Sequence, residues 1–278
     1  MYWKSNGIVF SLFFISSILY GSDKIVSVAT LEDYSPFGFV VGNSVGDESI
    51  PPGRNSYKYQ GYSWDVLRES FHIMGYTIKL SVSPWKRAMM NFKAGKVDIL
   101  FPTGMNEERL KVFDYSQEFV NEAKYLIYVQ ADDISIKWTG LESLKGLVIG
   151  VKRGFSYGDK WESFDSVTKF DVNTTLQGFQ MLEKGRINGF LGYENIWDYF
   201  LKQKDWNKKY RKTPSFDSSK EYVVVLKTNP NGQTILKDFD TGKQKLTQSG
   251  RLEEIENFWF GTDDLLRQNS KPYVNLEH

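Results

Sequence analysis

The sequence predicts an α/β fold of two lobes, and three observations support this class. Short apolar runs alternate with stretches whose apolar residues recur at helical spacing. Residues 92–100 and residues 182–190 have the same pattern of residue types, in which the end of a helix is followed by a glycine, a basic residue and a strand. The last part of the chain has one strong strand followed only by helical stretches, so we expect it to return to the first lobe. Two similar lobes explain all three, although helix–glycine–strand segments are common enough for a chance match.

The composition is that of an ordinary globular protein. Of 278 residues, 41% are hydrophobic and 25% are charged, which gives enough core for one large or two modest domains. Lys and Arg number 35 against 34 Asp and Glu, so no global field attracts nucleic acid or an anionic membrane. We therefore expect no nucleic-acid partner, and selectivity must lie in a local site.

The first residues predict export. One charge, Lys4, precedes an apolar run at residues 8–20 that only serines interrupt, and the small residues Gly21 and Ser22 follow. This order is typical of a secretory signal peptide, here residues 1–22, whereas a membrane span needs roughly 20 apolar residues. The alternative is an uncleaved membrane anchor. Cysteine is absent, which removes disulfides, thiol chemistry and a lipidated cysteine. A soluble, periplasmic protein is the simplest interpretation.

The first predicted strand covers residues 25–30 and leads into a turn that carries Tyr34 and Phe37. Aromatic side chains beside a strand end indicate a stacking surface, and core packing is the alternative. Residues 43–59 are rich in glycine and proline and lack periodicity, which predicts a long loop or insertion. A helical stripe, a second strand and a helix opened by Trp85 complete this part of the chain.

The stretch with the strongest functional signal joins a strand to an arginine. Residues 97–101 predict a buried strand, after which Asn106 caps a short helix that carries Arg109. Ligands of open α/β sheets bind beyond the carboxyl ends of strands, and a guanidinium presents a rigid fork of donors that matches a carboxylate. The alternative is an exposed helix arginine paired with Glu107 or Glu108.

The second half of the chain repeats the alternation of strands and helices. A compact strand at residues 125–129 is followed by a helix opening at residues 154–157, whose free N–H groups favour an anion. The segment KEYVVVLK at residues 220–227 is the last strong strand. The predicted division is a first lobe of residues 23–125 and 222–260, a second lobe of residues 131–213, hinge segments at residues 126–130 and 214–221, and a tail at residues 261–278.

Five pieces of sequence, in order along the chain, carry a family resemblance: residues 34–37 (YSPF), residues 61–66 (GYSWDV), residues 85–98, Arg109 with residues 115–116 (YS), and residues 144–154. Because these five segments occur together and in this order, residues 25–261 resemble the periplasmic solute-binding proteins of the amino-acid type, family 3. The resemblance implies a two-lobed Venus-flytrap fold with two hinge crossovers. It also implies a monomeric receptor that closes on a small solute and delivers it to an inner-membrane ABC permease.

The resemblance also implies a set of ligand contacts. By position, Arg109 holds the ligand carboxylate, Ser156 assists from the second lobe, and Tyr34 and Trp85 stack against the ligand. A charge-assisted bidentate pair in a closed, dry cleft is much stronger than one in water. The complete list of candidate ligand-binding residues is Tyr34, Phe37, Trp85, Gly104, Asn106, Arg109, Ser156, Tyr193 and Glu194. No catalytic residue, metal site or cofactor is predicted.

Departures from the family pattern leave the ligand open. Gly104 stands where a serine is common, Asn106 replaces the usual threonine, and Tyr193 stands where an acidic residue pairs with the α-amine. Glu194 is one position away, and a slip of one residue at a strand end turns a side chain to the other face. The ligand is therefore either an unusual amino acid or a small carboxylate without an α-amine.

Two other functions remain as alternatives. One is an enzyme on the same fold, of the dehydratase type, in which Glu194 or Asp33 acts as a lone acid or base. The chain has no cysteine and no histidine in a triad pattern, which argues against it. The other is a ligand sensor that contacts a membrane signalling protein instead of a permease. The sequence does not separate transport from sensing.

Overall fold

The computed structural model of the protein describes residues 24–42, 46–153 and 155–261. The predicted signal peptide lies outside the described residues, as does the predicted tail beyond residue 261. None of the helices formed by the described residues is long and apolar enough to cross a bilayer.

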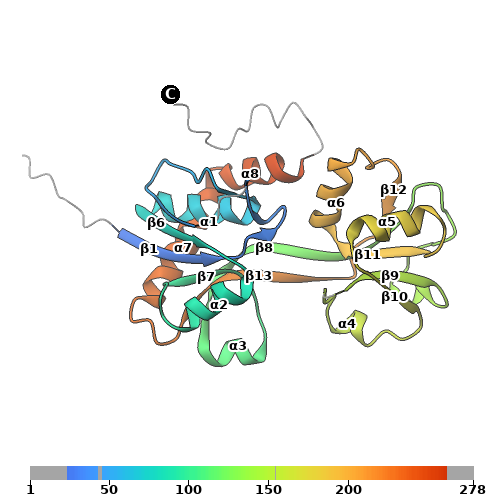
Figure 1. The fold of residues 1–278 in the computed structure, drawn as a ribbon, viewed down its shortest axis with the longest axis horizontal. Coiled ribbons are helices and arrows are strands. Elements are labelled where there is room, and N and C mark those ends of the chain that lie inside the picture. Colours follow the sequence, from blue (N-terminus) through green and yellow to red (C-terminus); the bar gives the residue numbers. More distant parts are fainter. Residues whose placement is uncertain (1–23, 43–45, 154, 262–278) are drawn as a thin grey trace, which may run out of the picture.

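Most strands join one mixed sheet that runs through both lobes (Figure 1). The strands are β1 (Lys24–Thr30), β2 (Asp33–Tyr34), β3 (Gly38–Val40), β4 (Asp47–Ile50), β5 (Tyr59–Gln60), β6 (Tyr76–Val82), β7 (Ile99–Gly104), β8 (Phe113–Gln130), β9 (Val148–Lys152), β10 (Thr168–Val172), β11 (Gly189–Tyr193), β12 (Tyr210–Lys212) and β13 (Asp217–Leu226). The order across the large sheet is β10-β9-β11-β8-β13-β7-β1-β6-β4, with β12 paired to β8, while β2, β3 and β5 form a small separate sheet.

Helices cover both faces of the sheet in each lobe (Figure 1). They are α1 (Tyr62–Ile73), α2 (Trp85–Lys93), α3 (Glu107–Val112), the 3₁₀ helix η1 (Leu141–Leu144), α4 (Asp159–Glu162), α5 (Thr175–Glu183), α6 (Glu194–Gln203), α7 (Gly232–Gln248) and α8 (Arg251–Phe260). In the first lobe α1, α7 and α8 pack on one face and α2 on the other. In the second lobe α5 and α6 share one face, and α4 lies on the other.

The two lobes repeat one sheet plan. In the first, β6, β1 and β7 are parallel and β13 pairs antiparallel with β7. In the second, β10, β9 and β11 are parallel and β8 pairs antiparallel with β11. The long strands β8 and β13 also pair with each other and connect the lobes. The two-lobed α/β fold with two crossovers is confirmed, while the boundaries that the sequence assigns to lobes and hinge stay predictions.

The internal repeat is confirmed at the level of the backbone. Helices α2 and α5 both end at a glycine with positive φ, 69° at Gly95 and 63° at Gly185. In both copies the glycine N–H and the next N–H donate back to the last turn of the helix. The residue before the following strand then binds the neighbouring parallel strand. Asp98 accepts from Ser27 N and Oγ at 2.8 and 2.6 Å, and Asn188 accepts from Val148 N at 2.9 Å.

This repeat leads to an expected stability difference. Asp98→Ala removes a charged, half-buried acceptor of two hydrogen bonds, so we expect a loss of about 2 kcal/mol in the free energy of unfolding. Asn188→Ala removes one exposed neutral acceptor and should cost about 1 kcal/mol or less. Chemical denaturation of the two variants measures both values. A larger loss for the asparagine would contradict the assignment of these contacts.

Three details of the sequence-based description are wrong. The predicted compact strand at residues 125–129 is the end of β8, which begins at Phe113 because it pairs along its length with β13. The helix expected to open at residues 154–157 is not formed by residues 155–157, since α4 begins at Asp159 and Ser156 lies in the preceding loop. The predicted loop at residues 43–59 contains β4, which pairs with β6 at the edge of the sheet.

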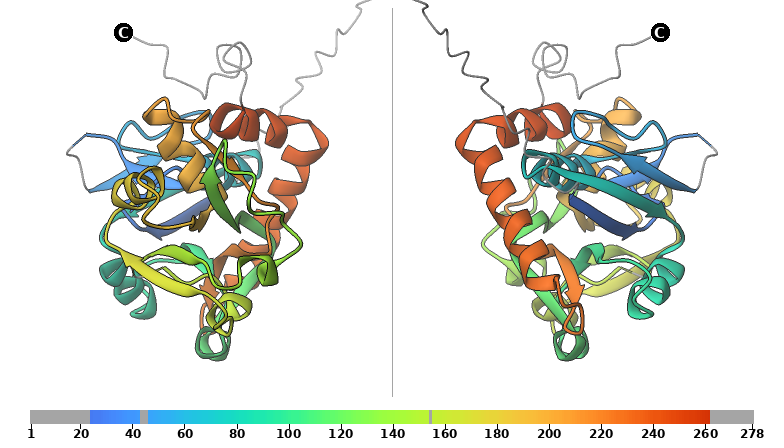
Figure 2. Two further views of the ribbon diagram at one scale, coloured as in Figure 1. Left: turned by 90° about the vertical axis from the view of Figure 1, so that its right-hand side faces the viewer. Right: turned by 90° about the vertical axis from the view of Figure 1, so that its left-hand side faces the viewer.

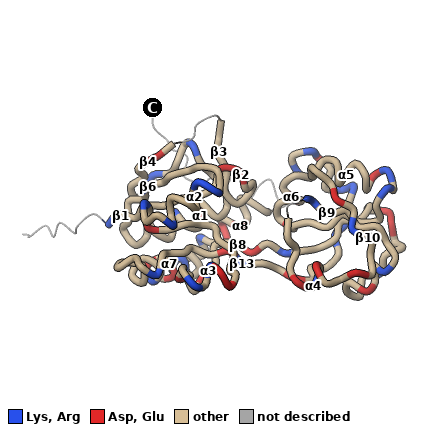
Figure 3. The backbone as a smooth tube through the Cα atoms, turned by 60° about the horizontal axis from the view of Figure 1, so that its bottom comes forward, with Lys and Arg blue, Asp and Glu red and all other residues tan. Residues whose placement is uncertain are grey.

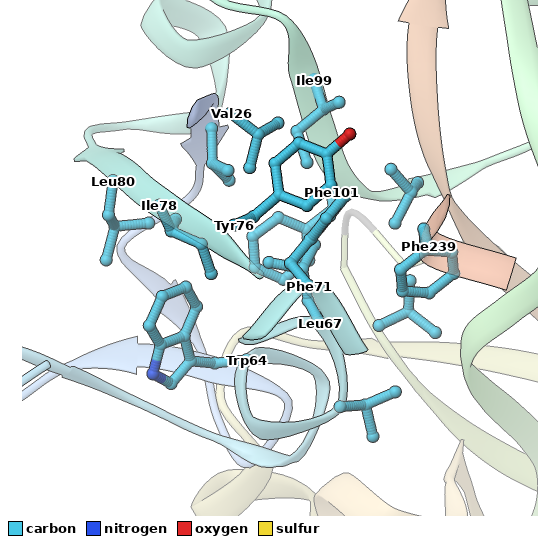
Figure 4. Packing of buried hydrophobic residues seen from close by; sticks show 14 of the residues in the cluster. Val26, Trp64, Leu67, Phe71, Tyr76, Ile78, Leu80, Ile99, Phe101 and Phe239 are labelled. Atoms are coloured by element: carbon cyan, nitrogen blue, oxygen red, sulfur yellow. The ribbon is translucent and has the colours of Figure 1, made fainter. Parts of the chain in front are cut away.

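The core of the first lobe joins elements from both ends of the chain. Figure 4 shows Trp64 and Phe71 of α1 packed with strand residues such as Phe101 and with Phe239 of α7. Figure 2 shows α7 and α8, in orange and red, beside the blue N-terminal strands. Helices α1 and α7 approach closely at Gly242, where an added Cβ would lie 2.7 Å from the carbonyl carbon of Ser70. Helices α7 and α8 therefore pack in one apolar core with the N-terminal strands.

Candidate ligand-binding cleft

A cavity of about 910 Å³ lies between the two lobes, and we call it the interlobe cleft. Its lining comes from three sources. The first lobe supplies Asp33, Tyr34, Trp85, Gly104 and Arg109, the second lobe supplies Lys152, Phe155, Ser156, Asp159 and Tyr193, and the connecting strands β8 and β13 supply Ala123, Tyr125, Ser218, Ser219 and Glu221. Both lobes thus present polar and aromatic side chains to one space.

Arg109 is held by the strand end and helix that the sequence predicts around it. The Asn106 side chain caps α3 by accepting from the Arg109 N–H at 2.9 Å. The Arg109 Nη1 donates to the Gly104 carbonyl at 2.7 Å, and its guanidinium carbon lies 5.9 Å from the centre of the Trp85 ring. Among the described residues no carboxylate forms an ion pair with Arg109, so the pairing with a neighbouring glutamate that the sequence left open is not formed. The guanidinium retains donors for an anion.

Glu221 of β13 brings a negative charge to the same cleft. It lies opposite Gly104 of β7 and Asn121 of β8 in the sheet register. The Asn121 Nδ2 donates to Glu221 Oε2 at 2.6 Å, while its Oδ1 accepts from Ser63 Oγ at 2.7 Å. Burial raises the pKa of the Glu221 carboxyl, and hydrogen bonds from Asn121 and Tyr34 oppose part of that rise. The carboxylate is therefore fixed in place by neutral donors.

The second-lobe wall of the cleft is aromatic with one cation. Tyr193 stacks on Tyr125 at 5.1 Å between ring centres, contacts Phe155 at 4.9 Å, and donates its hydroxyl to the Ser156 carbonyl at 2.7 Å. The Lys152 Nζ lies 4.4 Å from the centre of the Phe155 ring. Burial lowers the pKa of Lys152, and the Asp33 charge across the cleft opposes this change. Among the described residues, no cluster of His, Asp or Glu is arranged to hold a metal ion.

The structure brings six of the nine candidate residues together in the cleft lining: Tyr34, Trp85, Gly104, Arg109, Ser156 and Tyr193. Three others lie elsewhere. Phe37 is fully buried in the first-lobe core, 5.1 Å from the Tyr34 ring. Asn106 lines a smaller neighbouring cavity of about 360 Å³. Glu194 opens α6, where its Oε1 accepts from Lys212 at 2.7 Å.

The sequence interpretation missed Lys152, Phe155 and Glu221. Lys152 is the last residue of the parallel strand β9, so its position at a carboxyl strand end was a usable signal. Glu221 is an acidic residue inside the predicted last strand, and alternation along a strand places it on the face of Val223. A charge on an otherwise apolar strand face is a signal for a buried polar site.

Two α/β lobes, a cleft between them and unpaired charges of both signs inside it define a two-lobed receptor for a small polar solute. Residues 26–262 match the family model of the bacterial extracellular solute-binding proteins, family 3, and the chain belongs to this family.

Solved structures agree with this fold. The L-cystine solute receptor of Neisseria gonorrhoeae, in its unliganded open conformation, is 21% identical, with a TM-score of 0.69 over 87% of this chain and 95% of that chain. The second substrate-binding domain of Lactococcus lactis GlnP, also open, is 20% identical, with a TM-score of 0.67 over 87% of this chain and 98% of that chain. The second substrate-binding domain of a putative amino acid ABC transporter from Streptococcus pneumoniae is 18% identical, with a TM-score of 0.66 over 84% and 99%. No curated protein sequence matches the chain.

Proposed function

We propose that this protein is an exported, monomeric receptor that captures a small carboxylate-bearing solute, an amino acid or close relative, for an ABC importer. The observation that carries the proposal is the guanidinium of Arg109, which lines the interlobe cleft and forms no ion pair with any described residue. Membership of family 3 supports the transport role, and the solved relatives named above include amino acid transport proteins. The periplasm is the compartment in which such a receptor meets its permease.

The cleft geometry suits capture of a small anion by closure. Arg109 presents its fork from the first lobe, and Lys152 and the aromatic side chains of Phe155 and Tyr193 face it from the second. Bending at the paired strands β8 and β13 brings such walls together around a solute. Closure expels water, which strengthens the ion pair between the guanidinium and a carboxylate. The bound solute thus holds the lobes together.

A receptor fits the residues of the cleft better than an enzyme does. The chain has no cysteine, and Glu194, one of the two acids considered for catalysis, is paired with Lys212 outside the cleft lining. Asp33, the other, is exposed at the cleft edge. Neither has a partner arranged as a base or nucleophile within the part of the chain that the structure describes. We therefore assign binding without turnover.

A ligand screen tests the proposed function. We expect at least one of the twenty standard L-amino acids to raise the melting temperature of the purified protein. At a hundred times Kd a ligand stabilises by about 2.7 kcal/mol, which corresponds to a shift of roughly 5 to 10 °C for a protein of this size. The same amino acid as its primary amide, which has no carboxylate, should give no shift. If neither amino acids nor small carboxylates bind, or if mass spectrometry detects turnover of a bound solute, the proposal fails.

A further inference from the structure

Glu221 and Arg109 carry opposite charges in one cleft, yet they do not form an ion pair. The Arg109 guanidinium donates to the carbonyl of Gly104, and the sheet register places Glu221 directly beside Gly104. Burial raises the pKa of Glu221, and the charge of Arg109 opposes this rise, so the two groups are within electrostatic reach. No ion pair of Glu221 occurs among the described residues. The cleft therefore holds two separated charges of opposite sign.

The partners that Glu221 does have position it without neutralising it. Asn121 is almost fully buried, and the hydroxyl of Ser63 holds its amide so that Nδ2 faces Glu221 at 2.6 Å. The Tyr34 hydroxyl contributes a second neutral hydrogen bond. A half-buried carboxylate with only neutral donors carries a desolvation cost that a cation in the cleft would offset.

Glu221 differs from the other acids that line the cleft. Asp33 and Asp159 are both exposed, and Asp33 already faces the charge of Lys152. Glu194 is occupied by Lys212 and does not line the cleft. Figure 3 shows acidic residues on the connecting strands β8 and β13. Glu221 belongs to β13 and lines the interlobe cleft. Glu221 is the acid in this lining that combines partial burial with a fixed orientation.

We propose that Glu221 is the subsite for a positively charged group of the bound solute, an α-ammonium or a side-chain ammonium or guanidinium. The inference rests on the proposed function, because Arg109 holds the carboxylate of the same solute. The solute then spans the two charges of the cleft as a zwitterion. The connecting strand β13 then supplies the subsite for the cation, and Tyr193 of the second lobe supplies an aromatic wall.

The test compares amino acids with analogues that lack one cation. Calorimetric titration of the intact protein uses each L-amino acid that shifts the melting temperature, together with its deaminated carboxylic acid. For L-lysine, 6-aminohexanoic acid removes only the α-ammonium and L-norleucine only the side-chain ammonium. We expect the wild type to bind the amino acid about a hundredfold more tightly than the analogue that lacks the recognised cation. With that analogue bound, the Glu221 carboxylate is left in the closed cleft without a positively charged partner. The lysine series shows which of the two cations Glu221 receives.

Glu221→Gln should remove this discrimination. The variant is expected to bind the amino acid about a hundredfold more weakly and its deaminated analogue within about threefold of wild type. The empty variant should melt no lower than wild type, because glutamine keeps an oxygen for Asn121 and removes a desolvated charge. Tyr34→Phe, which keeps the ring, should reduce discrimination about fivefold. The matched control is Glu122→Gln on the neighbouring rung of the same strand pair, whose carboxylate accepts from Ser218 and does not line the cleft.

Several results would overturn the subsite. Near-equal binding of amino acids and deaminated acids by the wild type, with both dependent on Arg109, leaves the proposed function standing and makes this inference wrong. The inference is also wrong if the Glu221→Gln variant still prefers the amino acid over its deaminated analogue, or if Glu194→Gln removes that preference instead. The proposed function stands in both cases. If Glu221→Gln weakens binding of the amino acid and of its deaminated analogue equally, and also lowers the melting temperature, Glu221 has a structural role only. If no amino acid and no carboxylic acid binds, the proposed function and this subsite fall together.

Discussion

Arg109→Ala is expected to weaken binding of the amino acid found in the ligand screen about a hundredfold. The substitution removes a charge-assisted hydrogen-bond donor and leaves the ligand carboxylate unpaired in the cleft, which costs on the order of 3 kcal/mol. The melting temperature of the empty protein should change little, because within residues 24–261 as described the guanidinium has one hydrogen bond, to Gly104, and a distant contact with the Trp85 ring. Calorimetric titration and thermal melting measure the two effects separately.

Arg109→Lys serves as the matched variant. Lysine keeps the charge but offers a single ammonium, which does not reproduce the planar fork of donors toward a carboxylate. We therefore expect it to restore only a small part of the lost affinity. Wild-type affinity in Arg109→Ala would show that the carboxylate is held elsewhere, and wild-type affinity in Arg109→Lys would show that charge alone decides.

Gly242→Ala is expected to destabilise the protein by about 3 kcal/mol, in the range of overpacked cores. In a solvent-exposed helix the same change stabilises by about 1 kcal/mol, because alanine has the higher helix propensity. Here the new Cβ would lie 2.7 Å from the carbonyl carbon of Ser70 and still closer to its oxygen, so α7 must move away from α1. The closely packed core around Phe71 and Phe239 resists that shift.

Chemical denaturation tests this sign reversal. Gln244→Ala, on the exposed face of the same helix two residues later, is the control and should change the free energy of unfolding by no more than about 0.5 kcal/mol. A stabilised Gly242→Ala protein would mean that the two helices are farther apart than the structure has them. Binding by the surviving folded fraction should be unaffected, since Gly242 is remote from the cleft lining.

The sequence predicts the fold well where local signals and tertiary contacts agree. The glycine stops at Gly95 and Gly185 need positive φ, and the basic residue and strand that follow are visible in the sequence, so the repeat could be found without coordinates. Asn106 could be identified as a cap for the same reason. Strand β8 could not be bounded, because its first half is ordered by pairing with β13 a hundred residues away, and such pairing leaves no local periodicity.

Cleft residues that lie at the end of a strand could be predicted from the sequence. Cleft residues that depend on how distant strands pair could not. Arg109 follows directly from the order of strand, turn and capped helix. The role proposed for Glu221 depends on its position opposite Asn121 and beside Gly104, which no single segment of sequence encodes. Glu194 shows the converse, because its sequence position next to Tyr193 says nothing of the Lys212 side chain that binds it. Pairings across strands and helices decide which acid lines the cleft.

Because the chain returns to the first lobe at its C-terminal side, the core of the second lobe can form before the core of the first lobe during synthesis. The apolar clusters of the second lobe draw on residues between Ala123 and Phe216 only. The first-lobe cluster includes residues from Val26 onward but also Val223, Phe239 and Trp259 near the end of the described chain. A growing chain can therefore bury the second lobe while the first, although begun earlier, still lacks β13, α7 and α8. Nascent residues of the first lobe keep apolar surface exposed until α8 emerges, and it is this lobe that a chaperone would have to shield.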